Sequence, residues 1–225
     1  TVNGTLTQTV DTPSNVFATG NPLIDFSGTQ VNYVNATNGN TTITANSTMP
    51  TTLMVSTNTT NKWYYEYKVT ALSTSSNATS HGWSTEKNIR MGSNTWAASN
   101  TLWLYATDGD VFNGTWAGAG TAPTYTTGDI IGCLVDLNAN EIKWYKNGTL
   151  AYTFSSVTFD GDLIFPCLQC VTAGSTVSAN FGNGIFGTTA VSSANSDPNG
   201  LGIFEYNTNG GYALCTKNIN AQEYS

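Results

Sequence analysis

A catalytic acid, base or nucleophile is hard to select from the side chains of this 225-residue chain. His81 is the only histidine, so a Ser–His–Asp or a Cys–His site would have to be built around it. Residues 73–80 just before it are Ser, Thr, Asn and Ala, which is typical of a loop too flexible to hold a catalytic group in place. We therefore expect His81 to be a surface loop residue and the protein not to be an enzyme.

Four cysteines could in principle bind a metal: Cys133, Cys167, Cys170 and Cys215. Cys167 and Cys170 have C-x-x-C spacing, but a zinc site needs four ligands and the chain has no second pair. Cys133 lies inside an apolar run, where a thiol packs as a small hydrophobe. We expect buried free thiols, no metal and no cofactor, with a Cys–Cys pair as the alternative in an oxidising compartment.

Two Asp-Gly-Asp segments, at 108–110 and 160–162, place paired carboxylates around a glycine. A calcium site would need several more oxygen ligands at fixed spacing, and the chain has no EF-hand pattern. A glycoside hydrolase also uses two carboxylates, but the sequence selects no such pair. Ordinary β-turns account for both segments.

The six tryptophans are the strongest candidates for binding. Trp63 and Trp144 fall on strand faces with other large apolar residues, which predicts that they belong to the core. The other four lie in the loop-rich middle of the chain, where exposed aromatic side chains would anchor an interface or stack on a sugar ring. The alternative is that they close the ends of the fold. The candidate partner-binding residues are Trp83, Trp96, Trp103, Asp108, Trp116 and Tyr125.

The elements that would position these residues are β-strands. Residues 130–137 form an apolar run that is too short for a helix, and its β-branched content predicts a strand covered on both faces. A turn at 138–140 leads to an alternating segment, and Asn147-Gly148 then gives the strongest local signal for a tight hairpin. The stretch from 130 to 154 is therefore predicted to be a three-stranded antiparallel meander. Further strands are predicted near residues 63–69, 103–105, 111–112, 163–168 and 177–181, and several short ones between 23 and 55.

These segments also carry a family pattern. Its elements are, in order, Gly128-Asp129-Ile130-Ile131-Gly132, Asp136, Asn147-Gly148, Phe165-Pro166 and Asn180-Phe181-Gly182. Together with the strand at 62–67 they resemble the SPRY domain over roughly residues 60–182. The resemblance implies a concanavalin-like antiparallel β-sandwich (a jelly roll) whose variable loops form a binding surface.

The two ends of the chain carry a second resemblance. Asp11-Thr12-Pro13 and Asn21-Pro22-Leu23 near the start, with GYALCTKN at 211–218, resemble SPRY-containing structural proteins of tailed phages. This resemblance implies a component of a virus particle.

The charge of the chain argues against nucleic acid as a partner. Only 9% of the residues are charged and the net charge is −7, so Lys and Arg cannot easily form the basic face that nucleic acid requires. Thr, Asn and Ser carry the polar surface instead, as in many β-rich extracellular or particle-surface proteins. The sequence shows no apolar run long enough to insert into a membrane.

We therefore predict an all-β protein with an extended N-terminal arm at 1–22, a SPRY-like sandwich at 23–185, and a C-terminal extension at 186–225. The extension would pack on the sandwich or on a neighbouring molecule. The function we infer is that of a non-enzymatic virion structural protein, a capsid decoration, head-fibre or tail-fibre module at the virion surface. Its partners would be other virion proteins, with a glycan or protein of the host surface as a further contact, and we expect a homo-oligomer.

Two other functions remain open. One is a glycan-binding, lectin-like module that uses the loop tryptophans. The other is a cellular SPRY adaptor that recognises a peptide.

Overall fold

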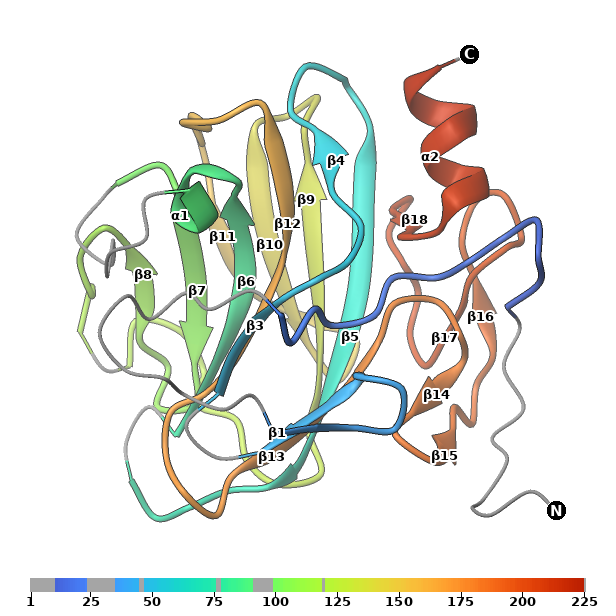
Figure 1. The fold of residues 1–225 in the computed structure, drawn as a ribbon. Helices are drawn as coiled ribbons and strands as arrows, with labels where there is room; N and C mark the ends of the chain where they lie inside the picture. The colour runs from blue at the N-terminus through green and yellow to red at the C-terminus, as the bar shows by residue number, and fades with distance from the viewer. Residues whose placement is uncertain are drawn as a thin grey trace, which may run out of the picture.

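Period-two alternation of apolar residues lets a strand bury one face, and two such sheets can bury their apolar faces against each other. The computed structural model describes residues 11–23, 35–44, 47–75, 78–90, 99–118 and 120–224. In this part of the chain two mainly antiparallel sheets pack face to face (Figure 1). The predicted all-β sandwich is confirmed.

The larger sheet contains eight strands. Their order is β1 (Asn35–Thr37), β2 (Thr42–Thr44), β13 (Thr176–Asn180), β5 (Lys62–Ala71), β9 (Ile130–Asp136), β10 (Glu141–Lys146) and β11 (Thr149–Phe154), and the short β18 (Tyr212–Ala213) runs parallel to β5.

The smaller sheet contains six strands. Their order is β3 (Ser47–Pro50), β12 (Leu163–Cys170), β6 (Thr79–Thr85), β7 (Leu102–Ala106) and β8 (Val111–Asn113), with β4 (Val55–Ser56) beside β12. The remaining elements are two small sheets, β14 (Ile185–Phe186) with β15 (Thr189–Ala190) and β16 (Asn195–Ser196) with β17 (Ile203–Phe204), and the helices α1 (Lys87–Arg90) and α2 (Thr216–Glu223).

Strand β5 supplies the centre of the core. Trp63, Tyr65 and Tyr67 alternate on one of its faces and are fully buried between the sheets. Trp83 of β6 and Trp103 of β7, which lie opposite each other in the smaller sheet, belong to the same buried cluster. The alternation read from the sequence thus identifies the buried face of β5.

His81 does not lie in a surface loop, contrary to our expectation. It is fully buried within β6, and its ring packs on Tyr67 with the ring centroids 3.7 Å apart. The polar loop ends earlier than its composition indicates, because β6 already begins at Thr79. Burial lowers the pKa of His81 well below its ordinary value, so the imidazole is neutral.

The predicted meander is formed by β9, β10 and β11. Its tight hairpin has positive φ at both Asn147 and Gly148, as a type I′ turn requires. The Asn147 side chain accepts a hydrogen bond from Ile130 N–H at 2.9 Å and donates one to the Asp129 carboxylate at 2.7 Å. The GD and NG elements of the family pattern are therefore in direct contact.

The other face of β5 is covered by the C-terminal part of the chain. Tyr64 of β5 and Leu134 of β9 pack with Phe204, Ala213 and other residues in a second buried cluster. The rings of Tyr64 and Phe204 meet edge to face with centroids 5.1 Å apart. The residues after the last long strand, β13, therefore complete the burial of the central strands.

Glu66 is fully buried on this outer face of β5. Its carboxylate accepts hydrogen bonds from the backbone N–H groups of Glu205 at 2.9 Å and Tyr206 at 2.8 Å, and from the Tyr64 hydroxyl at 3.2 Å. Burial raises the pKa of Glu66 to about 7, against the opposing effect of these three donors.

A second buried carboxylate organises the C-terminal part itself. One oxygen of Asp197 accepts from Leu201 N–H at 2.7 Å and Gly202 N–H at 2.9 Å. The other accepts from Ala213 N–H at 3.1 Å and from the Asn218 amide at 2.7 Å. Asp197 thereby ties the turn after β16, strand β18 and helix α2 together.

The segment 11–23 runs across the molecule as a strap (Figure 1). Ala18 N–H donates to Leu214 O at 2.8 Å, and Phe17 forms an isolated bridge with Cys215. Further along, Gly20 forms a bridge with Thr51. The strap thus links the C-terminal part of the chain to the segment between β3 and β4.

The domain boundaries given above stay a prediction. The strands expected around Ile24 and Val31 lie outside the described residues.

The buried carboxylate of Glu66 makes stability depend on pH. Between about pH 4.5 and 7 the folded protein keeps the Glu66 carboxyl group protonated, whereas the unfolded chain loses that proton. The contribution of Glu66 to the free energy of unfolding therefore falls as pH rises through that range. His81 titrates with the opposite sign, because its folded pKa is lowered. We therefore compare urea unfolding of wild type and Glu66→Gln at pH 5 and pH 7. Relative to the variant, wild type should lose about 2 kcal/mol over this interval. Parallel pH profiles of the two proteins would contradict a raised pKa.

The C-terminal part should unfold together with the sandwich. Phe204→Ala leaves a cavity against Tyr64 and should lower the free energy of unfolding by about 3 kcal/mol. The exposed Thr188→Ala is the control and should change it by less than about 0.5 kcal/mol. Unfolding is followed by tryptophan fluorescence and by far-UV circular dichroism. Two separate transitions, of which the variant moves only one, would show that the extension unfolds independently.

Candidate binding pocket at one end of the sandwich

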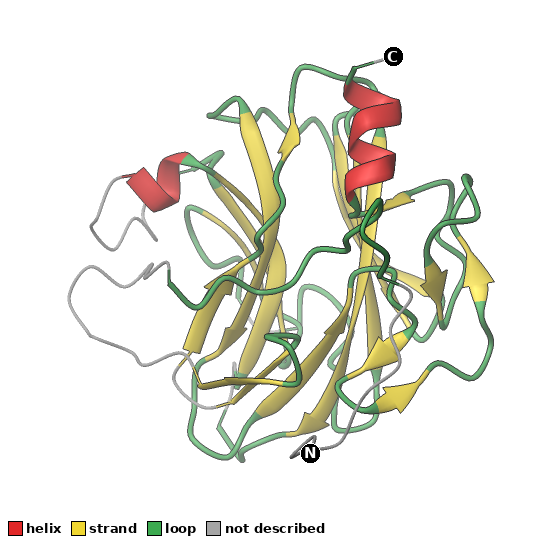
Figure 2. Cartoon of the chain, turned by 45° about the vertical axis from the view of Figure 1, so that its right-hand side comes forward, coloured by secondary structure: helices red, strands yellow, loops and turns green. Residues whose placement is uncertain are grey.

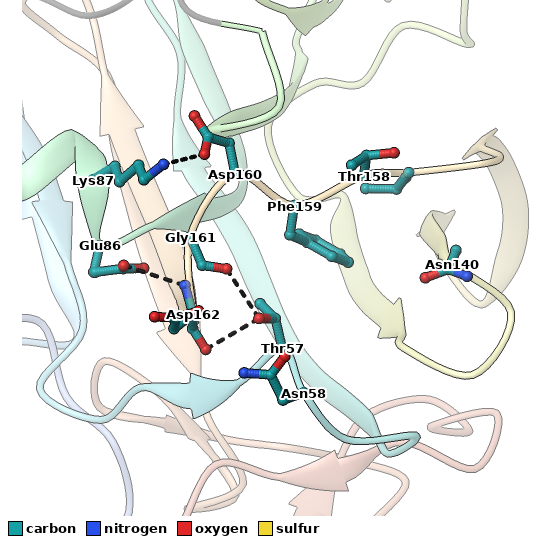
Figure 3. A pocket seen from close by; sticks show the side chains of 11 residues that line it. Thr57, Asn58, Glu86, Lys87, Asn140, Thr158, Phe159, Asp160, Gly161 and Asp162 are labelled. Carbon is teal, nitrogen blue, oxygen red and sulfur yellow. Dashed lines mark hydrogen bonds and ion pairs between the residues drawn. The ribbon is translucent and has the colours of Figure 1, made fainter.

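Several loops meet where β6 and β9 end and where β5 and β12 begin. They enclose a pocket of about 590 Å³. Its lining consists of Thr57, Asn58, Glu86, Lys87, Asn140, Val157, Thr158, Phe159, Asp160, Gly161 and Asp162 (Figure 3). Glu86 and Lys87 lie on one side of it, and Phe159 and Asn140 on the other (Figure 3).

Glu86 holds the loop between β11 and β12 in place. Its buried carboxylate accepts hydrogen bonds from Asp162 N–H at 3.2 Å and Leu163 N–H at 3.0 Å. Gly161 has a φ of +153°, and a Cβ there would lie 2.6 Å from a Glu86 oxygen. The glycine of this Asp-Gly-Asp segment is therefore needed for the close approach of the carboxylate.

Thr57 joins the β4–β5 loop to the same segment. Its backbone N–H donates to Asp162 O at 2.9 Å, and its hydroxyl donates to Gly161 O at 3.0 Å. Across the pocket, Val157 N–H donates to Asn140 O at 2.8 Å. These contacts fix the pocket walls to one another.

Phe159 is the aromatic residue of the pocket. It is partly exposed, and its ring packs against buried Trp103 in a T-shaped pair with centroids 5.0 Å apart. Trp103 therefore supports the pocket from behind without facing it.

The pocket has an acidic balance. Glu86, Asp160 and Asp162 contribute three carboxylates, and Lys87 contributes one ammonium group, which forms an ion pair with Asp160. The Glu86 carboxylate is engaged by backbone N–H groups, whereas the Asp162 side chain is exposed. A cationic group entering the pocket would thus meet a net negative charge.

The candidate residues named from the sequence do not gather in this pocket. Trp83 and Trp103 are fully buried, and Tyr125 is 3% exposed, so these three face the core and not a partner. This corrects the expectation that they lie on a loop surface. Long side chains from β6, β7 and the segment before β9 fill the space between the sheets.

Asp108, Trp116 and Trp96 have different surroundings. Asp108 lies in the β7–β8 turn, at the end opposite the pocket, where its carboxylate accepts a hydrogen bond from Asp110 N–H at 3.1 Å. Trp116 is 40% exposed and packs on Phe112 with ring centroids 4.9 Å apart. Trp96 lies outside the described residues.

The four cysteines are free and buried. Burial raises the pKa of the Cys167 and Cys170 thiols to about 12, so both stay protonated at neutral pH. Within the ranges that the structure describes, no group of three or more His, Cys, Asp or Glu side chains is arranged to hold a metal ion. Across the same residues, neither helix is long and apolar enough to cross a membrane.

The two-sheet architecture and the contacts between pattern residues agree with comparison to known families, since the SPRY domain matches residues 62–184. This chain belongs to the SPRY domain family. Among curated proteins, Ran-binding protein 9 of Xenopus tropicalis is 38% identical over 80 residues, which cover 35% of this chain and 14% of that protein. Human Ran-binding protein 9 is 38% identical over 76 residues, covering 33% of this chain and 10% of that protein.

A solved structure supports the SPRY fold. The TRIM65 PSpry domain shares 13% identity with this chain at a TM-score of 0.52, over 73% of this chain and 92% of that one. The aligned part of the Ran-binding proteins spans at most 14% of their length, so this SPRY domain is compared with only a small part of each.

These comparisons correct the predicted location. The expectation of a virion-surface protein is wrong, because the curated proteins similar to this SPRY domain include cellular Ran-binding proteins of animals. The resemblance of the chain ends to tailed-phage proteins gains no support from them, and neither do virion partners, carbohydrate binding or a homo-oligomer.

Sequence reasoning missed the residues that build the pocket of this SPRY domain. Phe159, Glu86 and Thr57 come from three separate loops, and no local pattern links them. The one available signal is the Asp-Gly-Asp segment at 160–162, which on sequence alone predicts an ordinary turn. It supplies one wall of the pocket.

Loss of the Glu86 carboxylate should loosen the β11–β12 loop. Glu86→Ala removes the acceptor of two backbone N–H groups and should lower the free energy of unfolding by about 2 kcal/mol, measured by urea unfolding. Asp162→Asn removes a charge from the same pocket without touching those bonds and should cost less than about 0.5 kcal/mol. Equal losses in the two variants would argue against a structural role specific to Glu86.

Proposed function

We propose that this SPRY domain is a protein-interaction module. It binds a peptide segment of its partner in the pocket that lies where β5 and β12 begin. Membership of the SPRY family supports a protein partner, because the curated relatives are named for binding a protein, Ran. The match covers too little of those proteins to support Ran itself as the partner of this chain. Of the functions left open by the sequence, the peptide-recognition adaptor thus has the best support.

The single observation that carries the proposal is the pocket. It is open and largely polar, and its walls are fixed by hydrogen bonds from several loops, so it offers a preformed site. The role we propose is binding and not catalysis.

The chemistry of the lining favours a peptide with a basic side chain. The carboxylate of Asp162 would pair with a Lys or Arg, and the partly exposed ring of Phe159 would pack against the aliphatic stem or the cationic head. Asn58 and Asn140 are exposed at the pocket, where their amides can both donate to and accept from a peptide backbone.

The test is selection of peptides from a displayed random library with the folded chain, followed by titration of the selected peptides. We expect enrichment of Lys and Arg. Asp162→Asn should weaken binding about fivefold, and the effect should shrink at high salt. Phe159→Ala should weaken binding at least tenfold.

Asp108→Asn is a matched control, because it makes the same change in the other Asp-Gly-Asp turn, at the opposite end of the sandwich. It should leave affinity unchanged. Selected peptides that lose binding with Asp108→Asn but not with Asp162→Asn would place recognition at the opposite end. Selection of acidic or purely apolar peptides would exclude the partner chemistry proposed here.

A further inference from the structure

The last turn of helix α2 holds one wall of the pocket from outside. The Glu223 carboxylate accepts a hydrogen bond from Ser56 N–H at 2.7 Å, and Gln222 O accepts one from the Asn61 side-chain amide at 3.0 Å. Both views of the fold show α2 beside the start of β5 (Figures 1 and 2). The two contacts lie on either side of Thr57 and Asn58, the residues that this loop contributes to the pocket.

The hydrogen bonds continue from this loop across the pocket wall. Thr57 bonds through its N–H and its hydroxyl to the backbone of residues 161–162, and Glu86 accepts from the N–H of Asp162 (Figure 3). Glu86 also accepts from the N–H of Leu163. A displacement of Ser56 would therefore be transmitted to the loop that carries Phe159 and Asp160.

Helix α2 is itself fixed at its start. Thr216 N–H donates to Val16 O at 3.0 Å and Lys217 N–H to the Asn15 side chain at 3.1 Å, and the Asn218 amide is bound to Asp197. The strap thus supplies the acceptors that Cys215, as N-cap, does not supply with its side chain. With its start and its last turn both attached, α2 connects the strap to the pocket.

Glu223 is an unfavourable residue for the helix alone. A negative charge in the last turn opposes the helix dipole, and α2 has no basic residue there to offset it. Its carboxylate instead accepts a hydrogen bond from the backbone N–H of Ser56, at the end of β4, a donor that would otherwise need water or another acceptor. The hydrogen bond to Ser56, and not the stability of α2, accounts for a carboxylate at position 223.

We propose that Glu223 is a positioning residue for the pocket: it seats the β4–β5 loop so that Thr57 and Asn58 face the ligand, without touching the ligand itself. This inference rests on the proposed function for its binding consequence.

The experiment combines amide hydrogen exchange with titration of a peptide selected as described above. Glu223→Ala should raise exchange about tenfold at Ser56 and Thr57 and also at Asp162 and Leu163, which it does not contact, and should weaken peptide binding about fivefold. Ala is a better helix former than Glu, so the substitution does not itself disfavour α2.

Two variants separate positioning from a general loss of structure. Glu223→Gln keeps an oxygen acceptor for Ser56 N–H and should restore exchange and affinity to within about twofold of wild type. Gln222→Ala removes the neighbouring side chain but keeps the carbonyl that binds Asn61, so it should behave as wild type.

Faster exchange confined to Ser56, with residues 162–163 unchanged in Glu223→Ala, would overturn the positioning role. Unchanged peptide affinity in that variant, with Phe159→Ala abolishing binding, would overturn its link to the ligand. If Phe159→Ala leaves peptide binding intact, the proposed function fails, and the exchange measurement alone still decides whether α2 positions the loop.

Discussion

Strand β5 is buried on both faces, and the rest of the structure depends on this double burial. Its inner face carries the aromatic residues of the core, as an ordinary sandwich strand would. Its outer face carries Tyr64 and Glu66, and a carboxylate buried without donors would be very costly. The backbone N–H groups of Glu205 and Tyr206 meet that requirement. The C-terminal residues are therefore required by the chemistry of the central strand and are not an optional addition to the sandwich.

The polar residues that identify the family form hydrogen bonds and ion pairs with other parts of the same chain. Asp129 binds Asn147, and Asp136 forms an ion pair with Lys62 at 2.8 Å. Asn180 accepts hydrogen bonds from the N–H groups of Gly182 and Gly184, and its own amide binds the chain at residue 203. Such residues define turns and strand ends, so they reveal the architecture. The pocket is lined by residues outside this pattern, and the turns and strand ends do not determine which side chains stand there.

The sequence predicts the fold well wherever the signal is local. The meander and the inner face of β5 follow from period-two alternation and from one Asn-Gly turn. Helix α2 has no such signal, because TKNINAQE lacks an apolar stripe. The N–H groups of its first turn are instead bound by Val16 and Asn15, some 200 residues away in the chain. The burial of His81 and of Trp103 likewise depends on which strands lie opposite them. The candidate site was missed for the same reason, since it exists only where loops distant in sequence come together.

The bridge between Phe17 and Cys215 also constrains the order in which the molecule can assemble during synthesis. A contact between residues this far apart requires the closure of a very long loop, and the chain from Phe17 to Cys215 must have emerged from the ribosome before it can form. Until residues 201–215 are in place, Tyr64 and Leu134 lack the cover of Phe204 and Ala213, and Glu66 lacks the backbone donors at 205 and 206. The nascent sandwich thus carries an exposed apolar surface beside a carboxylate that stays hydrated, and residues 201–215, which are translated after both sheets except β18, convert it into a closed, water-excluding structure.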